Sequence, residues 1–308
     1  MKAAVKPGLW KKWTNQLDLQ SMVWPGIIFV AIFSYIPMYG VVMAFQQYDI
    51  FNGIMDSPWA GFMHFRMFFE APEFWNVMRN TIVISLLKLV ITFPAPILLA
   101  LMLNEVGNMG FKRFVQTVSY LPYFLSWVIV SGFVFSLLSV DNGTVNFLLE
   151  RLNLIQEPVN FLAVPEYFWS ILVSVNVWKE IGFGSIVYLA AIAGVDPALY
   201  EAASIDGASR FKQIFSITLP SISPVIIIFM ILAIGNLLSA GFEDILLLAT
   251  NPILRPYSDV IDTYVYRVGI LNARFSYATA VGLFKAVISV ILLVTANKIA
   301  RKADVSLW

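Results

Sequence analysis

Four ionisable side chains lie inside long apolar stretches of the sequence. Lys88 is near the middle of one stretch, Lys179 and Glu180 are near the middle of another, and Lys285 is within a third. Charges at such depth in an apolar segment are costly and usually face protein or a water-filled path. Three lysines against one acid favour a path for an anionic solute, such as a uronic-acid oligosaccharide. The alternative is structural: Lys179 pairs with Glu180, while Lys88 and Lys285 reach the membrane surface or seal a helix bundle.

Aromatic residues in the same stretches offer flat faces on which sugar rings can stack. Tyr120, Tyr123, Phe124 and Trp127 follow one another closely, and Trp178 lies in a later stretch. Such residues also serve as packing groups or as anchors at a membrane interface, and the sequence leaves both roles open. The candidates for a solute path are Lys88, Lys179, Lys285, Tyr123, Trp127 and Trp178.

The composition argues against an enzyme. Cysteine is absent and His64 is the only histidine, so a thiolate metal site, a metalloprotease or a Ser–His hydrolase is hard to build. The sequence has no G-x-x-x-x-G-K-[ST] phosphate-binding loop. The neighbouring acids Glu243 and Asp244 point in divergent directions on a helix, and no nucleophile accompanies them. We therefore expect neither catalysis nor a metal, and no cofactor bound to this chain.

A charged insert, EAASIDGASRFKQIFSITLP at 201–220, separates two of the apolar stretches. Asp196 and Pro197 are suited to start a short amphipathic helix, as an N-cap acid and a proline at the first helical position. Asp206 and Gly207 then break this helix, because glycine adopts backbone angles that other residues resist. A second short helix follows. A helix-turn-helix that protrudes from a membrane domain is suited to contact a partner, although an ordinary polar loop is the simpler interpretation.

The residues of this insert resemble the EAA signature of permeases in bacterial ABC importers, in the form typical of the sugar-importing branch. Nine residues separate Gly207 from Ile217, as that signature requires. The resemblance extends from about residue 24 to the C-terminus. The segments at 93–106, 119–132 and 260–270 are similar to the subfamily that handles complex oligosaccharides and polysaccharide fragments. The residues that the resemblance assigns to coupling with an ATPase are Glu201, Ala202, Ala203, Asp206, Gly207, Ala208, Ile217, Leu219 and Pro220.

The resemblance also implies a set of partners and a mechanism. It implies a heterodimer with a second, homologous permease, a dimer of ABC ATPase subunits that bind ATP and Mg, and an extracytoplasmic binding protein that delivers an oligosaccharide. ATP-driven closure of the ATPases is expected to move the insert and to rock the two permeases between outward-facing and inward-facing states. Lipid is the remaining partner, and no nucleic acid is expected.

The composition predicts a membrane protein without reference to any family. The chain has 59% hydrophobic and 13% charged residues, with a mean hydropathy of +0.78, whereas a soluble domain carries about 25% charged residues. Spanning helices need roughly 20 mostly apolar residues, and the long runs show no alternating polarity. We therefore predict an all-α, multi-pass protein, and the resemblance implies the type I ABC importer architecture. The six predicted spans are 21–45, 78–103, 114–138, 168–192, 221–249 and 277–297.

The distribution of lysine and arginine predicts the orientation. Most of those outside the spans lie in the tails and in the connections that share a side with the insert, which places both termini and the insert in the cytoplasm. We expect a cytoplasmic tail or interfacial helix over 1–20, one permease domain over 21–298 with a coupling loop at 196–220, and a cytoplasmic tail over 299–308. The expected location is the bacterial cytoplasmic membrane.

Two other classes of membrane protein remain as alternatives. A secondary transporter would hold its coupling ion in the spans, often at broken helices and between inverted repeats. The spans contain few carboxylates, and no repeat is visible. A membrane scaffold without transport activity would also explain a docking loop. Association with an ATPase, and ATP hydrolysis that responds to a solute-loaded binding protein, would distinguish the importer from both.

Overall fold

The computed structural model describes residues 17–303, 306 and 307, and this part of the chain is helical, with one isolated bridge between Gln46 and Trp59 as its extended pairing. Five of its helices are long and apolar enough to cross a membrane, and a pair of helices bent by 105° makes a sixth candidate. The predicted all-helical, multi-pass fold is confirmed. The tail or interfacial helix predicted over 1–20 lies almost wholly outside the described residues.

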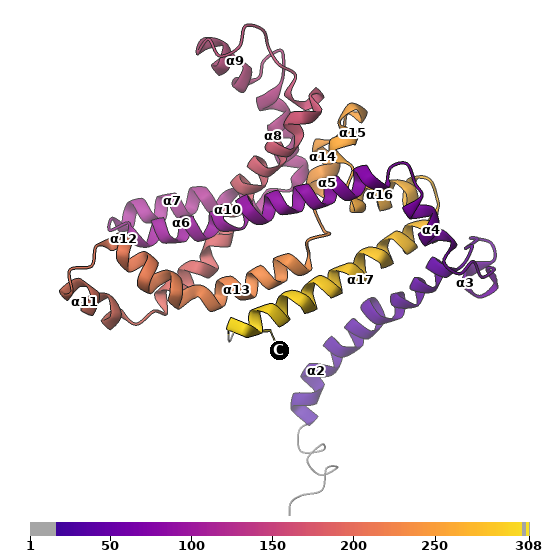
Figure 1. Cartoon of the computed structure of the whole chain (residues 1–308), viewed down its shortest axis with the longest axis horizontal. Coiled ribbons are helices and arrows are strands. Elements are labelled where there is room, and N and C mark those ends of the chain that lie inside the picture. Colours follow the sequence, from indigo (N-terminus) through magenta and orange to yellow (C-terminus); the bar gives the residue numbers. More distant parts are fainter. Residues whose placement is uncertain (1–16, 304–305, 308) are drawn as a thin grey trace, which may run out of the picture.

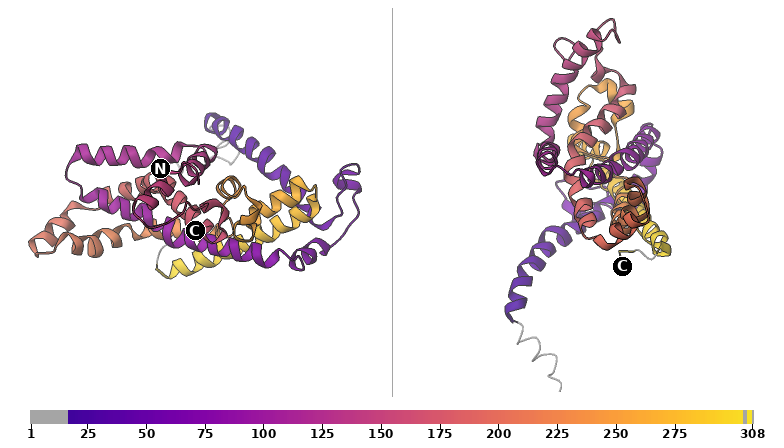
Figure 2. Two further views of the ribbon diagram at one scale, coloured as in Figure 1. Left: turned by 90° about the horizontal axis from the view of Figure 1, so that it is seen from above. Right: turned by 90° about the vertical axis from the view of Figure 1, so that its left-hand side faces the viewer.

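The first candidate span, Gln20–Phe45, leans away from the other helices (Figure 1, Figure 2). Only 6% of its most apolar 18-residue stretch is buried. Short helices on the outer side connect it to the second span. The elements of this region are α2 (Leu17–Val30), a π-helical turn (Ala31–Tyr35), a 3-10 helix (Ile36–Phe45), α3 (Gly53–Asp56) and α4 (Met63–Phe69).

The second span, Phe74–Glu105, changes its helical geometry at its middle. Pro94 has no N–H to donate, and just before it the Phe93 N–H bonds to the Lys88 carbonyl at 2.9 Å, five residues back. The turn that results presents the Lys88 side chain at the centre of the span. The elements are α5 (Phe74–Leu87), this π-helical turn (Lys88–Thr92) and α6 (Pro94–Glu105).

The third region is not the single straight span predicted over 114–138. It consists of α7 (Met109–Tyr120), a 3-10 turn (Leu121–Phe124) and α8 (Trp127–Leu138), and the two parts meet at 105°. The break has a local cause: Pro122 starts the 3-10 turn, and the Ser126 hydroxyl accepts a bond from the Ile129 N–H as the N-cap of α8.

Beyond the break, α8 and α9 (Thr144–Arg151) stand away from the main bundle (Figure 1). Two short 3-10 turns, Phe161–Ala163 and Pro165–Tyr167, lead into α10 (Phe168–Ala193), the central helix of the bundle. α10 and α7 approach each other so closely at Gly182 that a Cβ there would collide with the backbone of Ser119. Glycine is therefore required at this crossing.

The fifth span, Arg210–Gly235, starts and ends earlier than the predicted 221–249. The second half of the polar insert is already part of this span, and the chain leaves the helix at Asn236. The elements are α11 (Pro197–Ile205), α12 (Arg210–Gln213), a π-helical turn (Ile214–Thr218) and α13 (Leu219–Gly235).

Short helices on the outer side then lead to the last span, Phe275–Ala300. These helices pack over the outer ends of α5, α8 and α10. They are α14 (Glu243–Leu248), a 3-10 turn (Pro252–Leu254), α15 (Arg255–Ser258), α16 (Ile261–Tyr266) and a π-helical turn (Arg267–Leu271). The last span is α17 (Phe275–Ala300), which is followed by a 3-10 turn (Arg301–Ala303).

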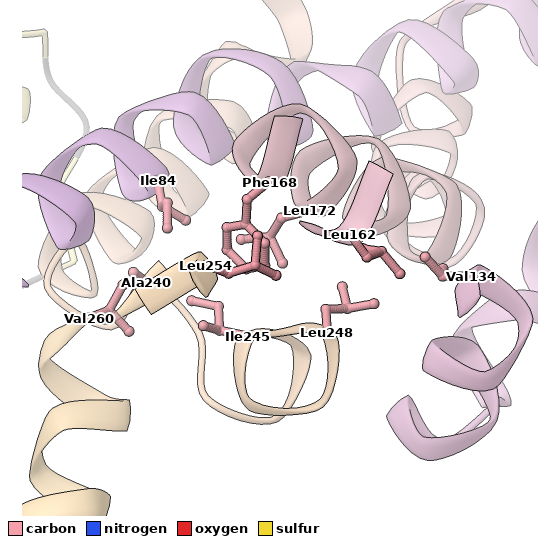
Figure 3. Close-up of a cluster of buried hydrophobic side chains, with 10 residues drawn as sticks. All are labelled: Ile84, Val134, Leu162, Phe168, Leu172, Ala240, Ile245, Leu248, Leu254 and Val260. Atoms are coloured by element: carbon pink, nitrogen blue, oxygen red, sulfur yellow. The ribbon is translucent and has the colours of Figure 1, made fainter. Parts of the chain in front are cut away.

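Buried apolar side chains form three clusters that hold these elements together. The cluster in Figure 3 joins α5, α8, α10 and α14 through residues such as Ile84, Phe168, Leu172 and Ile245. A second joins α4, α5, α16 and α17, and a third joins the inner halves of α6, α10 and α13. The outer helices are thereby fixed to the bundle, and α11 lies at the opposite end of the bundle from α3 and α4 (Figure 1).

Candidate functional site

The polar insert forms the predicted helix-turn-helix. The Asp196 carboxylate accepts a bond of 2.9 Å from the Ala198 N–H and caps α11, as its sequence position predicts. Gly207 has φ +74° at the turn, a left-handed conformation in which nothing crowds the position where a Cβ would lie. The glycine is therefore explained by its backbone angle alone.

Side-chain bonds tie the two halves of the insert together. The Gln213 amide donates to the Ser204 hydroxyl at 3.0 Å and to the Ala208 carbonyl at 3.1 Å. The hydroxyls of Tyr200 and Thr218 lie 2.9 Å apart and link α11 to the N-terminal part of the fifth span. A displacement of α11 is thus transmitted directly to the helix that continues as α13.

The insert is also apolar where it is uncovered. The exposed fractions of Ile205, Phe211 and Phe215 are 87%, 77% and 67%. The nine predicted coupling residues all lie on this continuous segment. Glu201, Ala202, Asp206, Gly207 and Pro220 are exposed, and the others, Ala203, Ala208, Ile217 and Leu219, are half-buried. Arg210 lies 3.6 Å from Glu105 at the end of α6, an exposed pair that contributes little stability.

A cavity of about 600 Å³ lies among the second, fourth and fifth spans. α10 contributes Asn176, Glu180, Phe183 and Gly184, which share one helix face because the last three follow Asn176 by four, seven and eight residues. Ser85, Lys88 and Thr92 line it from the second span, Phe229 and Leu232 from the fifth, and Asn236 from just after the end of the fifth. In the described part of the chain, the hydroxyls of Ser85 and Thr92 are buried without a hydrogen-bond partner.

A second hollow of about 300 Å³ shares Lys88, Asn176 and Glu180 with this cavity. Its other lining residues come from the start of α8 and from the loop before α14 together with the first residues of that helix: Trp127, Gly241, Phe242, Glu243 and Asp244. The two hollows together form a polar region at the level of the intramembrane charges.

Lys88 is paired within the chain. Its ammonium group donates to the Asp244 carboxylate at 2.6 Å and to the Ala240 carbonyl at 2.7 Å. The Asn176 amide also donates to the Asp244 carboxylate, at 3.2 Å. Gly241, at φ +137°, leaves room for that carboxylate, which a Cβ would strike. Three segments distant in sequence therefore meet at one ion pair.

Lys179 faces away from the cavity and toward the break between α7 and α8. It donates to the carbonyls of Pro122, Tyr123 and Leu125 at 3.3, 2.8 and 2.7 Å. Its ammonium group also lies 5.6 Å from the Tyr123 ring centre and 5.4 Å from that of Trp127. The pairing with Glu180 that the sequence suggested is thus replaced by bonds to backbone carbonyls at the break.

The other path candidates are dispersed. Lys285 is paired with Asp262 of α16. The Tyr123 ring stacks on Phe183 at 3.9 Å, so that face is covered. Trp178 lies on another side of α10, in an apolar groove with Trp169 and Ile91. Of the six, the structure brings Lys88 to the main cavity and Lys88 and Trp127 to the second hollow, and their roles toward a solute stay predictions.

Sequence reasoning missed most of the polar lining. Asn176 and Phe183 could have been found from the helix face that they share with Glu180, which the sequence already marked as an intramembrane acid. Asp244 could not, because its contact with Lys88 depends on where the fifth span ends. Asn236 was placed inside a predicted span and instead follows the end of α13.

The family model for the binding-protein-dependent transport system inner membrane component matches residues 92–305. The polygalacturonan/rhamnogalacturonan transport system permease protein YteP of Bacillus subtilis (strain 168) is 47% identical over 293 residues, covering 94% of this chain and 90% of YteP. The protein LplB of the same organism is 45% identical over 280 residues, covering 91% of this chain and 87% of LplB.

Two solved structures are similar along nearly the whole chain. One is a bacterial ABC transporter involved in the import of the acidic polysaccharide alginate, with a TM-score of 0.89, 45% identity and coverage of 96% of this chain and 99% of that one. The other is a bacterial alginate ABC transporter in complex with an alginate pentasaccharide-bound periplasmic protein, with a TM-score of 0.90, 44% identity and coverage of 97% and 99%.

Proposed function

The chain belongs to the family of binding-protein-dependent transport system inner membrane components, the permease subunits of ABC importers, and we propose that the solute it conducts is an acidic oligosaccharide. It is a multi-pass protein of the inner membrane and a transport component rather than an enzyme. It works with a periplasmic binding protein.

The observation that carries the mechanism is the continuity between the polar insert and the cavity. The span Arg210–Gly235 begins in the insert and carries Phe229 and Leu232 of the cavity lining near its other end. A force applied to α11 reaches this helix through the bonds of Gln213 and Tyr200. One helix, the span Arg210–Gly235, thus connects the insert to the proposed solute site.

We propose that two ABC ATPase subunits apply that force and that they bind the ATP and Mg. The exposed apolar side chains of Ile205, Phe211 and Phe215 offer them a surface to cover. Glu201 is exposed beside the small residues Ala202 and Ala203, where a charged partner can approach closely. ATP-driven closure then moves α11, and relaxation after hydrolysis returns it, so that the cavity faces each side in turn.

A second, homologous permease is proposed to complete the cavity. Phe183 and Val187 line it from α10, yet their exposed fractions in this chain are 37% and 41%. A partner on that side would cover both residues and close the path against lipid. Because a heterodimer carries two different linings, each permease can bind a different part of an asymmetric solute.

The proposal of an acidic solute rests on the relatives and not on the intramembrane lysines. YteP is described as a polygalacturonan/rhamnogalacturonan permease, and the solved neighbours import or bind alginate. Lys88 is neutralised by Asp244, Lys285 by Asp262, and Lys179 by backbone dipoles. The cavity therefore has no unpaired lysine among its lining residues in the described part of the chain.

The experiment is uptake of a labelled uronate oligosaccharide into proteoliposomes that contain this chain, its partner permease and the ATPases, with the binding protein added outside. We expect uptake that requires internal ATP and the binding protein, and that is lost in Glu201→Ala at unchanged abundance of this subunit. Uptake driven by an ion gradient without ATP would identify a secondary transporter. A complex that hydrolyses ATP but imports only neutral oligosaccharides would overturn the acidic solute.

A further inference from the structure

Glu180 is a carboxylate that faces the cavity without a partner in the chain. It lines both the main cavity and the adjoining hollow, and its side chain is exposed to them. Among the described residues no hydrogen bond or ion pair involves this carboxylate, although Lys88, Asp244 and Lys179 act on it at longer range. An ionisable residue inside a membrane span that faces an open cavity has a functional role by default.

The nearby charges do not neutralise Glu180 directly. Lys88 is held by Asp244 at 2.6 Å, and the Asn176 amide donates to the same carboxylate. Lys179 is held by three backbone carbonyls on the other side of the helix. With the Lys88–Asp244 pair neutral, Glu180 in its ionised form gives this wall of the cavity a net negative charge.

The chemistry of this wall is that of a site for sugar hydroxyls. An ionised carboxylate accepts hydrogen bonds and donates none, so it binds hydroxyl groups and repels another carboxylate. In a cavity of low dielectric that repulsion is much stronger than in water. Asn236 lines the same cavity, and its side-chain amide can both donate to and accept from hydroxyls.

We propose that Glu180 is a specificity-determining residue of the transport path: it binds the hydroxyl groups of a sugar ring and opposes the passage of a ring carboxylate at its level. Preference for acidic over neutral solutes then arises in the binding protein and not in this wall of the cavity. The inference rests on the proposed function, because it assigns one residue of that same cavity.

The test compares uptake of a uronate oligosaccharide and of a neutral oligosaccharide of equal length in wild type, Glu180→Gln, Glu180→Asp and Glu166→Gln. The readout is the ratio of acidic to neutral uptake within each variant, so differences in abundance and in the binding protein cancel. Glu166→Gln is the matched control, because Glu166 lies in the turn that leads into α10 and does not line the cavity.

We expect Glu180→Gln to raise the ratio roughly tenfold, the change that corresponds to about 1.4 kcal/mol of lost repulsion. Glu180→Asp keeps the charge and should stay near the wild-type ratio, and Glu166→Gln should equal wild type. An unchanged ratio in Glu180→Gln would overturn the proposal. So would a failure of both Glu180 variants to assemble, since that outcome assigns the carboxylate to pairing with the second permease.

The failure of the proposed function has a different signature. If the wild-type complex takes up neither solute, or takes them up without ATP, the transport assignment itself is wrong. If the wild type transports both and only the predicted shift of the ratio is missing, the transport assignment stands and the role of Glu180 is wrong.

Discussion

The charged ammonium group of Lys179 stabilises the break between α7 and α8. Its three bonds go to backbone carbonyls of the turn between α7 and α8, at a depth where water is scarce. The rings of Tyr123 and Trp127 contact the same ammonium group. The residue therefore acts as an internal cap of this break.

We predict that Lys179→Met lowers the stability of the subunit and reduces uptake of acidic and neutral solutes in the same proportion. A stranded buried acceptor costs about 1–3 kcal/mol, and this change strands several. The measurement is the melting temperature of the purified complex together with the uptake ratio. Lys298→Met, at an exposed position near the end of α17, is the control. A normal melting temperature with a selective loss of the acidic solute would return Lys179 to the solute path.

Lys88 and Asp244 are the residues at which a double-mutant cycle is informative. Lys88→Gln leaves the buried Asp244 carboxylate with only the Asn176 amide, and removing one partner of a buried pair costs about 3–5 kcal/mol. We predict that Lys88→Gln alone sharply lowers abundance, and that Lys88→Gln combined with Asp244→Asn largely restores it. Quantitative immunoblots of membranes measure this. Additive losses in the double variant would show that the two side chains do not interact.

The elements themselves illustrate how far the sequence leads. The apolar runs predicted the spans, and the Asp196 cap and the Gly207 turn were confirmed in position and geometry. The break near Ser126 and the early end of the fifth span were missed, because mean hydropathy stays high across both; the local signals, Pro122 and Ser126 at the break and Asn236 after the span, are single residues within apolar runs. Hydropathy indicates how favourably a segment partitions into an apolar environment. It carries no information about where the helix bends. The contact between Lys88 and Asp244 depends on where the fifth span ends and was therefore beyond prediction.

Gly207 allows a direct test of the turn. At φ +74° a side chain with a Cβ costs about 1–2 kcal/mol, and β-branching adds to that cost. We predict that uptake at matched abundance falls in the order wild type, Gly207→Ala, Gly207→Val. Gly194, at the C-terminal end of α10 with a negative φ of −86°, is the control position for the same pair of substitutions. Wild-type activity in Gly207→Val would show that the loop does not need this turn.

At the level of the whole molecule, we propose that the chain forms one half of a path. One end of the bundle carries an uncovered apolar surface on α11 and α12, and the cavity lining on α10 is left partly exposed. Both features are expected of a subunit whose remaining surfaces are supplied by other proteins. The first span, which leans away from the bundle, adds to this open outline (Figure 1).

The central claim is that ATP changes the side from which this cavity is open, and the absence of cysteine from the chain makes it directly measurable. In Ala233→Cys, the new thiol lies in the cavity lining and is the only one in this subunit. We would measure its rate of modification by a membrane-impermeant thiol reagent, added to each side of proteoliposomes with and without trapped ATP. The account predicts faster modification from the cytoplasmic side without ATP and from the outer side with ATP. Rates that are unaffected by ATP on both sides would contradict it.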